Sequence, residues 1–117
     1  MARRAFLLAN VAVRDPDRYR EYVENVPALI RKHGGVYRVR GGDFEVLEGD
    51  WTPSSLIVLE FPDREAALAF HNDPEYEPYR NLRQALSDSN LVVVDGDEEY
   101  PRLLQTGRVL PVSTSQV

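Results

Sequence analysis

The sequence predicts an α+β domain whose strands and helices follow the order β-α-β-β-α-β. Short apolar segments of strand type alternate with two longer segments whose apolar residues recur at helical spacing. Glycine and proline stand at the boundaries between these segments. The chain has 117 residues, of which 43% are hydrophobic and 28% charged, as is typical of one globular domain.

The first strand and the first helix have clear sequence signals. Residues 4–13 form a nearly continuous apolar run, interrupted by Asn10, that predicts a buried strand. Asp15-Pro16 predicts the start of a helix, because an N-cap carboxylate is followed there by proline. Gly34-Gly35 ends this helix. Pro27 lies inside it and is expected to kink it, because proline has no N–H to donate.

The middle of the chain predicts two further strands. Residues 36–40 alternate between apolar and polar side chains and predict the second strand. Gly41-Gly42 then fits either a hairpin turn or a bulge within one longer strand. Residues 44–48 are expected to form a short return strand. Residues 56–61 predict the third main strand, with Glu60 as its one charged member.

The last third of the chain predicts a helix, a strand and a tail. Pro62-Asp63 begins the helix, and Asp73-Pro74 breaks and restarts it. Residues 91–94 predict the last strand. We expect one domain over residues 1–96 and a C-terminal tail over residues 97–117 that is partly ordered at most and could dock on a neighbouring copy.

The predicted strands imply self-association. Two helices cover only one face of a four-stranded sheet, yet three of the strands carry apolar residues on both faces. The simplest cover for the second face is another copy of the chain, which gives a two-fold homodimer with its sheets face to face.

Composition excludes several classes of partner. The net charge of −5 argues against binding to nucleic acid. The absence of cysteine excludes disulfides and thiolate metal sites. No apolar segment is long enough to span a bilayer, and no secretory signal is recognised. We therefore expect a cytoplasmic protein with no nucleic-acid or membrane partner, no metal site and no cofactor.

Three polar residues are expected at one edge of the sheet. The split β-α-β topology makes the first and third strands neighbours, and a parallel arrangement of these two places Asn10 close to Glu60. Arg38, early in the second strand, is expected at the same edge. The simpler alternative is that Arg38 and Glu60 form an ion pair in the dimer while Asn10 binds backbone groups.

Several motifs in a fixed order resemble the family catalogued as domain of unknown function 1330. Over residues 5–96 they are Asp15-Pro16, Gly34-Gly35, Arg40-Gly41-Gly42, Glu48-Gly49-Asp50-Trp51, Leu59-Glu60-Phe61-Pro62, Asp73-Pro74-Glu75-Tyr76 and Arg83. The resemblance implies a ferredoxin-like domain of the dimeric α/β-barrel superfamily, with an antiparallel sheet and a homodimer. That superfamily includes monooxygenases, isomerases, cyclases and stress-response domains, so the resemblance assigns no activity.

The favoured function is that of a homodimeric domain that binds a small apolar or aromatic molecule. Tyrosines at helical spacing, among them Tyr19 and Tyr76, form either part of the core or the wall of a ligand pocket. Asn10, Glu60, Arg83 and either Arg38 or Arg40 are expected at its edge. Trp51 is expected to clamp the partner subunit, or else to act as a lid over the pocket.

Two other functions stay open. The first is a cofactor-independent enzyme of isomerase, cyclase or monooxygenase type that acts on a small phenolic or enolic substrate. In it Glu60 or His33 would accept a proton and an arginine would stabilise the enolate. Alternatively, His33 is only a partner of the helix end. The second is a purely structural dimer whose interior is filled.

Overall fold

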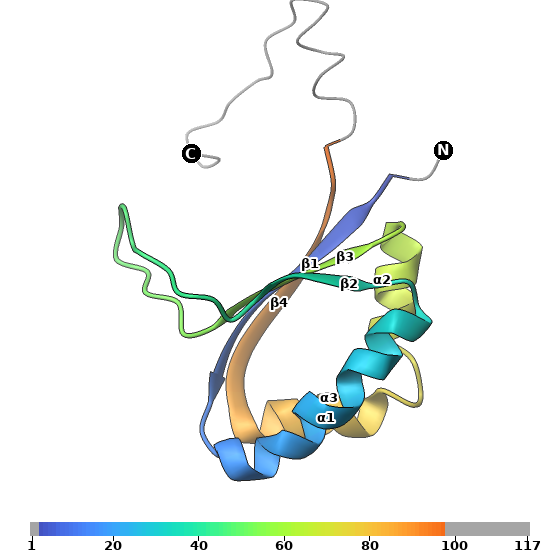
Figure 1. Ribbon diagram of the computed structural model, residues 1–117, viewed down its shortest axis with the longest axis horizontal. Coiled ribbons are helices and arrows are strands. Elements are labelled where there is room, and N and C mark those ends of the chain that lie inside the picture. Colours follow the sequence, from blue (N-terminus) through green and yellow to red (C-terminus); the bar gives the residue numbers. More distant parts are fainter. Residues whose placement is uncertain (1–2, 98–117) are drawn as a thin grey trace, which may run out of the picture.

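A computed structural model describes residues 3–97, which form a four-stranded sheet with three helices on one of its faces (Figure 1). The α+β class and the element order are as predicted, with the second helix in two parts. The division into a domain over residues 1–96 and a tail over residues 97–117 stays a prediction, because all of the tail except Asp97 lies outside the described residues.

The sheet is antiparallel throughout. Its strands are β1 (Ala5–Val13), β2 (Val36–Arg40), β3 (Leu56–Phe61) and β4 (Ser87–Asp95), in the order β2-β3-β1-β4. The helical crossover makes β2 run in the same direction as β1, and β3 then returns antiparallel to both. The expectation that the first and third strands are parallel was therefore wrong.

This correction separates two of the predicted site residues. In the antiparallel register of β1 and β3, Phe6 lies opposite Glu60 and Asn10 lies opposite Leu56. Asn10 and Glu60 are thus at opposite ends of the strand pair.

Helix α1 (Pro16–Lys32) has the predicted ends. The Asp15 carboxylate accepts a hydrogen bond from the backbone N–H of Arg18 at 3.2 Å, which satisfies one of the free donors of the first turn. The helix continues through Pro27. Beyond its end, Gly34 has a φ of +80°, in the left-handed region that favours glycine.

The second helical segment is divided at the predicted break. Helix α2 (Arg64–His71) is capped by Asp63, and α3 (Glu77–Leu86) follows after the Asp73-Pro74 pair. Strand β4 begins directly after α3, earlier than predicted. Its first half is polar and lacks the apolar signal, but it pairs with the end of β1.

The predicted short strand over residues 44–48 is not formed. Residues 41–55 make an irregular excursion, here called the arm, that extends away from the helices (Figure 1). No neighbouring strand is available to pair with this segment among the described residues. The bulge lies earlier, at Arg38, where the register of β2 against β3 shifts. Gly41 starts the arm with a φ of +67°, and its N–H donates to the carbonyl of Leu56.

The two faces of the sheet differ in their cover. Residues such as Leu7, Ala9 and Leu59 are buried beneath the helices. The opposite face, here called the open face, is not covered by any described element and presents exposed apolar side chains. They are Leu8, Val36, Val39, Val92 and Val94. The apolar residues predicted on both faces of the strands are therefore present.

Substitution of Gly35 tests the close contact between α1 and the sheet. A Cβ atom at this position lies 2.6 Å from the Ile30 side chain and 2.7 Å from the Phe61 ring, both in the core. We expect Gly35→Ala to lower the free energy of unfolding by about 1–3 kcal/mol, measured by urea denaturation. Gly42→Ala is the control, because a Cβ at Gly42 meets nothing within 4 Å. Equal unfolding midpoints for the two variants would contradict this packing.

Candidate functional site

A cavity of about 270 Å³ lies between the sheet and helices α1 and α3. Its floor consists of small and branched side chains of the helix-covered face, including Ala9, Val11 and Ile57. Helix α1 closes it from above with two tyrosines and Val23. The exposed lining residues are Val13, Val23, Arg40 and Gly41, which places the mouth beside the ends of β1 and β2.

Four tyrosines line the cavity. The rings of Tyr19 and Tyr22 are stacked with their centroids 4.8 Å apart, and the Tyr22 hydroxyl lies 2.6 Å from that of Tyr76. Tyr37 contributes from β2. Burial raises the pKa of Tyr19 to about 12, and burial is also the main cause that raises the pKa of Tyr22 and Tyr37. These three hydroxyls are therefore protonated at neutral pH and can donate hydrogen bonds to a ligand.

Arg83 is a buried cation on the cavity wall. Only 4% of this α3 residue is exposed. Its Nη1 donates to the Ser89 hydroxyl at 2.5 Å, while its buried Nε has no hydrogen-bond partner. No carboxylate among residues 3–97 forms an ion pair with it. Arginine stays protonated in proteins, and a buried charge without a partner costs several kcal/mol.

A second arginine lies at the mouth of the cavity. The guanidinium of Arg40 stands 4.3 Å from the centroid of the Tyr37 ring, a cation–π contact. The bulge at Arg38 brings Tyr37 and Arg40 to the same face of β2, although regular alternation would place them on opposite faces. The described lining residues therefore include two arginines and no aspartate, glutamate or histidine.

Four of the nine predicted site residues line this cavity: Tyr19, Arg40, Tyr76 and Arg83. Glu60 lies on the open face, where its carboxylate is 3.1 Å from Arg38 Nε and 3.7 Å from Arg4 Nη1. Glu60 and Arg38 thus pair with each other within one chain and do not contribute to the cavity wall.

Asn10 and Trp51 also lie outside the cavity lining. The side-chain oxygen of Asn10 accepts hydrogen bonds from the backbone N–H groups of Ser54 and Ser55 at 2.8 and 3.2 Å. It thereby fastens the root of the arm to β1. Trp51 lies in the arm with 63% of its surface exposed and does not line the cavity.

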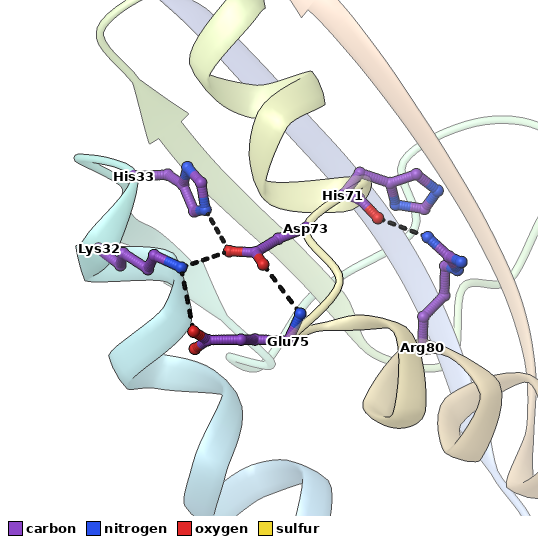
Figure 2. A network of polar contacts seen from close by, with 6 residues as sticks. All are labelled: Lys32, His33, His71, Asp73, Glu75 and Arg80. Atoms are coloured by element: carbon purple, nitrogen blue, oxygen red, sulfur yellow. Dashed lines mark hydrogen bonds and ion pairs between the residues drawn. The ribbon is translucent and has the colours of Figure 1, made fainter.

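His33 belongs to a separate polar network around Asp73 (Figure 2). The Asp73 carboxylate contacts His33 Nε2 at 2.7 Å and Lys32 Nζ at 2.9 Å, and it accepts a hydrogen bond from the Glu75 backbone N–H at 2.9 Å. The Lys32 and His33 hydrogen bonds hold the pKa of Asp73 well below its usual range. This network joins the end of α1 to the connection between α2 and α3.

His71 stands apart from that network. Figure 2 shows Arg80 reaching its backbone carbonyl, with Nη1 at 2.6 Å from the oxygen. Burial lowers the pKa of His71, and the charges of Arg80 and Arg83 lower it further. Residues 3–97 hold no group of three or more histidine and carboxylate side chains arranged to bind a metal ion.

Sequence reasoning missed two contributors to the cavity wall and its support. The alternating pattern of residues 36–40 predicts only that Tyr37 belongs to a strand. Ser89 precedes residues 91–94, the predicted last strand. The bulge at Arg38 and the polar first half of β4 leave no periodic signal, so neither residue could be placed on the correct face from the sequence.

A four-stranded antiparallel sheet of this order, with helices on one face, is the ferredoxin-like fold. The chain belongs to the family described as Domain of unknown function (DUF1330), whose model matches residues 4–97. This confirms the resemblance noted in the sequence. No curated protein matches the chain, and no helix within residues 3–97 is long and apolar enough to cross a bilayer.

Three solved structures illustrate the fold. A protein of unknown function from Rhodopseudomonas palustris is 23% identical with a TM-score of 0.67, over 82% of this chain and 84% of that one. SnoaB, a cofactor-independent oxygenase from Streptomyces nogalater, is 16% identical with a TM-score of 0.57, over 86% and 99%. A dimeric protein of unknown function from Bacteroides fragilis is 15% identical with a TM-score of 0.53, over 80% and 96%. At these identities the likeness concerns the fold alone.

Replacement of Asp73 tests the network around it. Because the folded pKa of Asp73 lies below its ordinary value of 3.8, its charge stabilises the native state above that pH and loses this effect as the pH falls below it. We expect Asp73→Asn to lower the thermal midpoint at pH 7, and the difference from the wild type to shrink on acidification below 3.8. Glu75→Gln, at a largely exposed side chain, is the control with little effect. A difference that stays constant on acidification would contradict this role.

Proposed function

We propose that this chain is a small-molecule-binding domain whose ligand occupies the cavity beneath α1. The main support for this proposal is the cavity itself. Most of its wall is apolar, but tyrosine hydroxyls and two arginines also line it. Protein interiors are otherwise close-packed, with few voids larger than a water molecule. A void of about 270 Å³ in so small a domain favours a binding function over a purely structural one.

The size and shape of the cavity indicate a flat ligand of one or two rings. A dry apolar cavity of roughly 150 Å³ holds a benzene molecule, so about 270 Å³ leaves room for a somewhat larger one. The stacked rings of Tyr19 and Tyr22 offer an aromatic surface to such a molecule. Their hydroxyls, together with that of Tyr76, can orient its polar groups.

Catalysis by proton abstraction is the second candidate, since SnoaB is described as a cofactor-independent oxygenase. The contacts of the two predicted bases support ligand binding better than catalysis. Glu60 and His33, the two predicted bases, have their partners elsewhere, and the described lining residues offer no carboxylate or imidazole. A tyrosine with a pKa of about 12 is ionised only in a fraction of about 10⁻⁵ at pH 7.

Filling the cavity is the direct test of this function. Ala9 lies on the floor, so Ala9→Leu places extra methyl groups into the void. We expect the wild-type chain to bind the flat two-ring fluorophore 2-naphthol with a change in its fluorescence, and Ala9→Leu to weaken this binding at least tenfold. Ala28→Leu, the same change at an exposed position of α1, is the control and should bind as the wild type does. Equal binding by the two variants, or no binding by the wild type, would contradict the proposal.

We also propose that the binding domain is a homodimer that covers the open face. Monomeric proteins seldom leave large contiguous apolar patches in water. The open face carries exposed leucine and valine from β1, β2 and β4, and the arm adds Phe44, Leu47 and Trp51, all exposed. The structural relative from Bacteroides fragilis is described as dimeric, which agrees with this proposal.

A charge in the middle of the open face tests the dimer. Leu8 on β1 is 37% exposed and lies between Val58 and Val92 of the neighbouring strands. We expect Leu8→Arg to shift the chain from dimer to monomer at micromolar concentration, measured by sedimentation velocity, because the interface would bury an unpaired charge. Leu68→Arg on α2, at a leucine that is 42% exposed on the helical side, should leave the dimer intact. A stable wild-type monomer would contradict the arrangement.

A further inference from the structure

We propose that the ligand of this cavity is an aromatic carboxylate whose acid group pairs with the buried guanidinium of Arg83. This inference rests on the proposed binding function and names the chemical class of the ligand. The flat apolar body would lie against the stacked tyrosines, and the acid group would lie at the inner end, near α3 and β4.

The first argument is the incomplete set of partners around Arg83. The side chain is 96% removed from solvent, yet Ser89 is the one hydrogen-bond partner of its guanidinium among the described residues, and Nε has none. A guanidinium is a fork of five N–H donors that suits the two oxygens of a carboxylate. An anion in the cavity that Arg83 lines would supply the missing counter-charge.

The second argument is the sign of the charge around the cavity. The whole chain has 19 acidic and 14 basic residues and a net charge of −5. The described lining nevertheless holds Arg83 and Arg40 and no acidic side chain. An acidic protein that presents a positive cavity selects anions, because the attraction between opposite charges is strongest where water is excluded.

The third argument is the supply of neutral donors in the same cavity. Tyr19 and Tyr22 line this cavity together with Arg83. Both hydroxyls stay protonated at neutral pH and can donate to an anionic oxygen. A carboxylate, with two acceptor oxygens, can use an arginine and a tyrosine together, whereas a phenolate presents one oxygen.

The experiment compares three probes of nearly the same shape on the full chain by isothermal titration calorimetry. The probes are 2-naphthoate, its neutral isostere 2-naphthamide, and 2-naphthol. We expect 2-naphthoate to bind at least tenfold more tightly than either of the others at pH 7. We also expect the chain to keep its preference for 2-naphthoate in 0.5 M sodium chloride, because salt screens a buried ion pair less than a surface one.

Three variants on α3 test whether this preference depends on Arg83. Arg83→Met keeps much of the side-chain length and removes the charge, and we expect it to bind 2-naphthoate and 2-naphthamide about equally. Arg80→Met makes the same change on the same helix outside the cavity lining and should keep the wild-type preference. Arg83→Lys keeps the charge but not the planar fork, and its preference should be intermediate.

The outcomes distinguish failure of the anion inference from failure of the proposed binding function. If 2-naphthamide binds the wild type as tightly as 2-naphthoate, or if Arg83→Met keeps the preference, the anion inference is wrong and the binding function stands. If 2-naphthol binds most tightly, the carboxylate assignment is wrong. If none of the three probes binds at millimolar concentration, both proposals are wrong. If circular dichroism shows that Arg83→Met is unfolded, two other measurements test the anion inference. They are the ratio of the wild-type affinities for 2-naphthoate and 2-naphthamide, and the same ratio for Arg83→Lys.

Discussion

The helices cover only one face of the sheet, and both the cavity and the exposed apolar face depend on this arrangement. Three helices lie on one face of four antiparallel strands, so one layer of side chains is buried and the other is left open. On the covered face, small residues of the sheet such as Ala9 and large residues of α1 such as Tyr19 and Tyr22 line the same cavity. The uncovered face presents its leucine and valine side chains instead. Both proposed properties, ligand binding and self-association, originate in this asymmetry.

Two charged groups show how differently this fold treats a buried charge. Asp73 is surrounded by donors from Lys32, His33 and the Glu75 backbone, so its charge is matched and it fixes the position of α1 against the helical break. Arg83 has one hydroxyl partner and no carboxylate within the described chain. The first arrangement is typical of a structural group, whereas the second leaves a charge without a counter-charge, which the proposed anionic ligand would provide.

Local signals in the sequence predicted the fold well, and long-range geometry was harder. Caps such as Asp15, the helix stop at Gly34-Gly35 and the break at Asp73-Pro74 depend on neighbouring residues, and all were recognised. The relative direction of β1 and β3 depends on the whole chain path, and its misassignment placed Asn10 beside Glu60. The bulge at Arg38 was equally hidden, although it turns Tyr37 and Arg40 toward the cavity. Helical spacing, in contrast, was sufficient to suggest Tyr19, whereas Tyr76 lies just before α3 rather than within a helix.

The fastening of the arm at its root separates two parts of the molecule. One asparagine side chain, that of Asn10, holds Ser54 and Ser55, and the Gly41 N–H closes the same root from the other strand. Beyond these bonds, none of residues 42–53 lines the cavity, whereas Gly41 and Ser55 at the root do. Under the proposals of a bound ligand and a homodimer, insertions in this outer segment would change the surface offered to a second copy but not the side chains that line the cavity. The two contact surfaces could then vary separately within one chain.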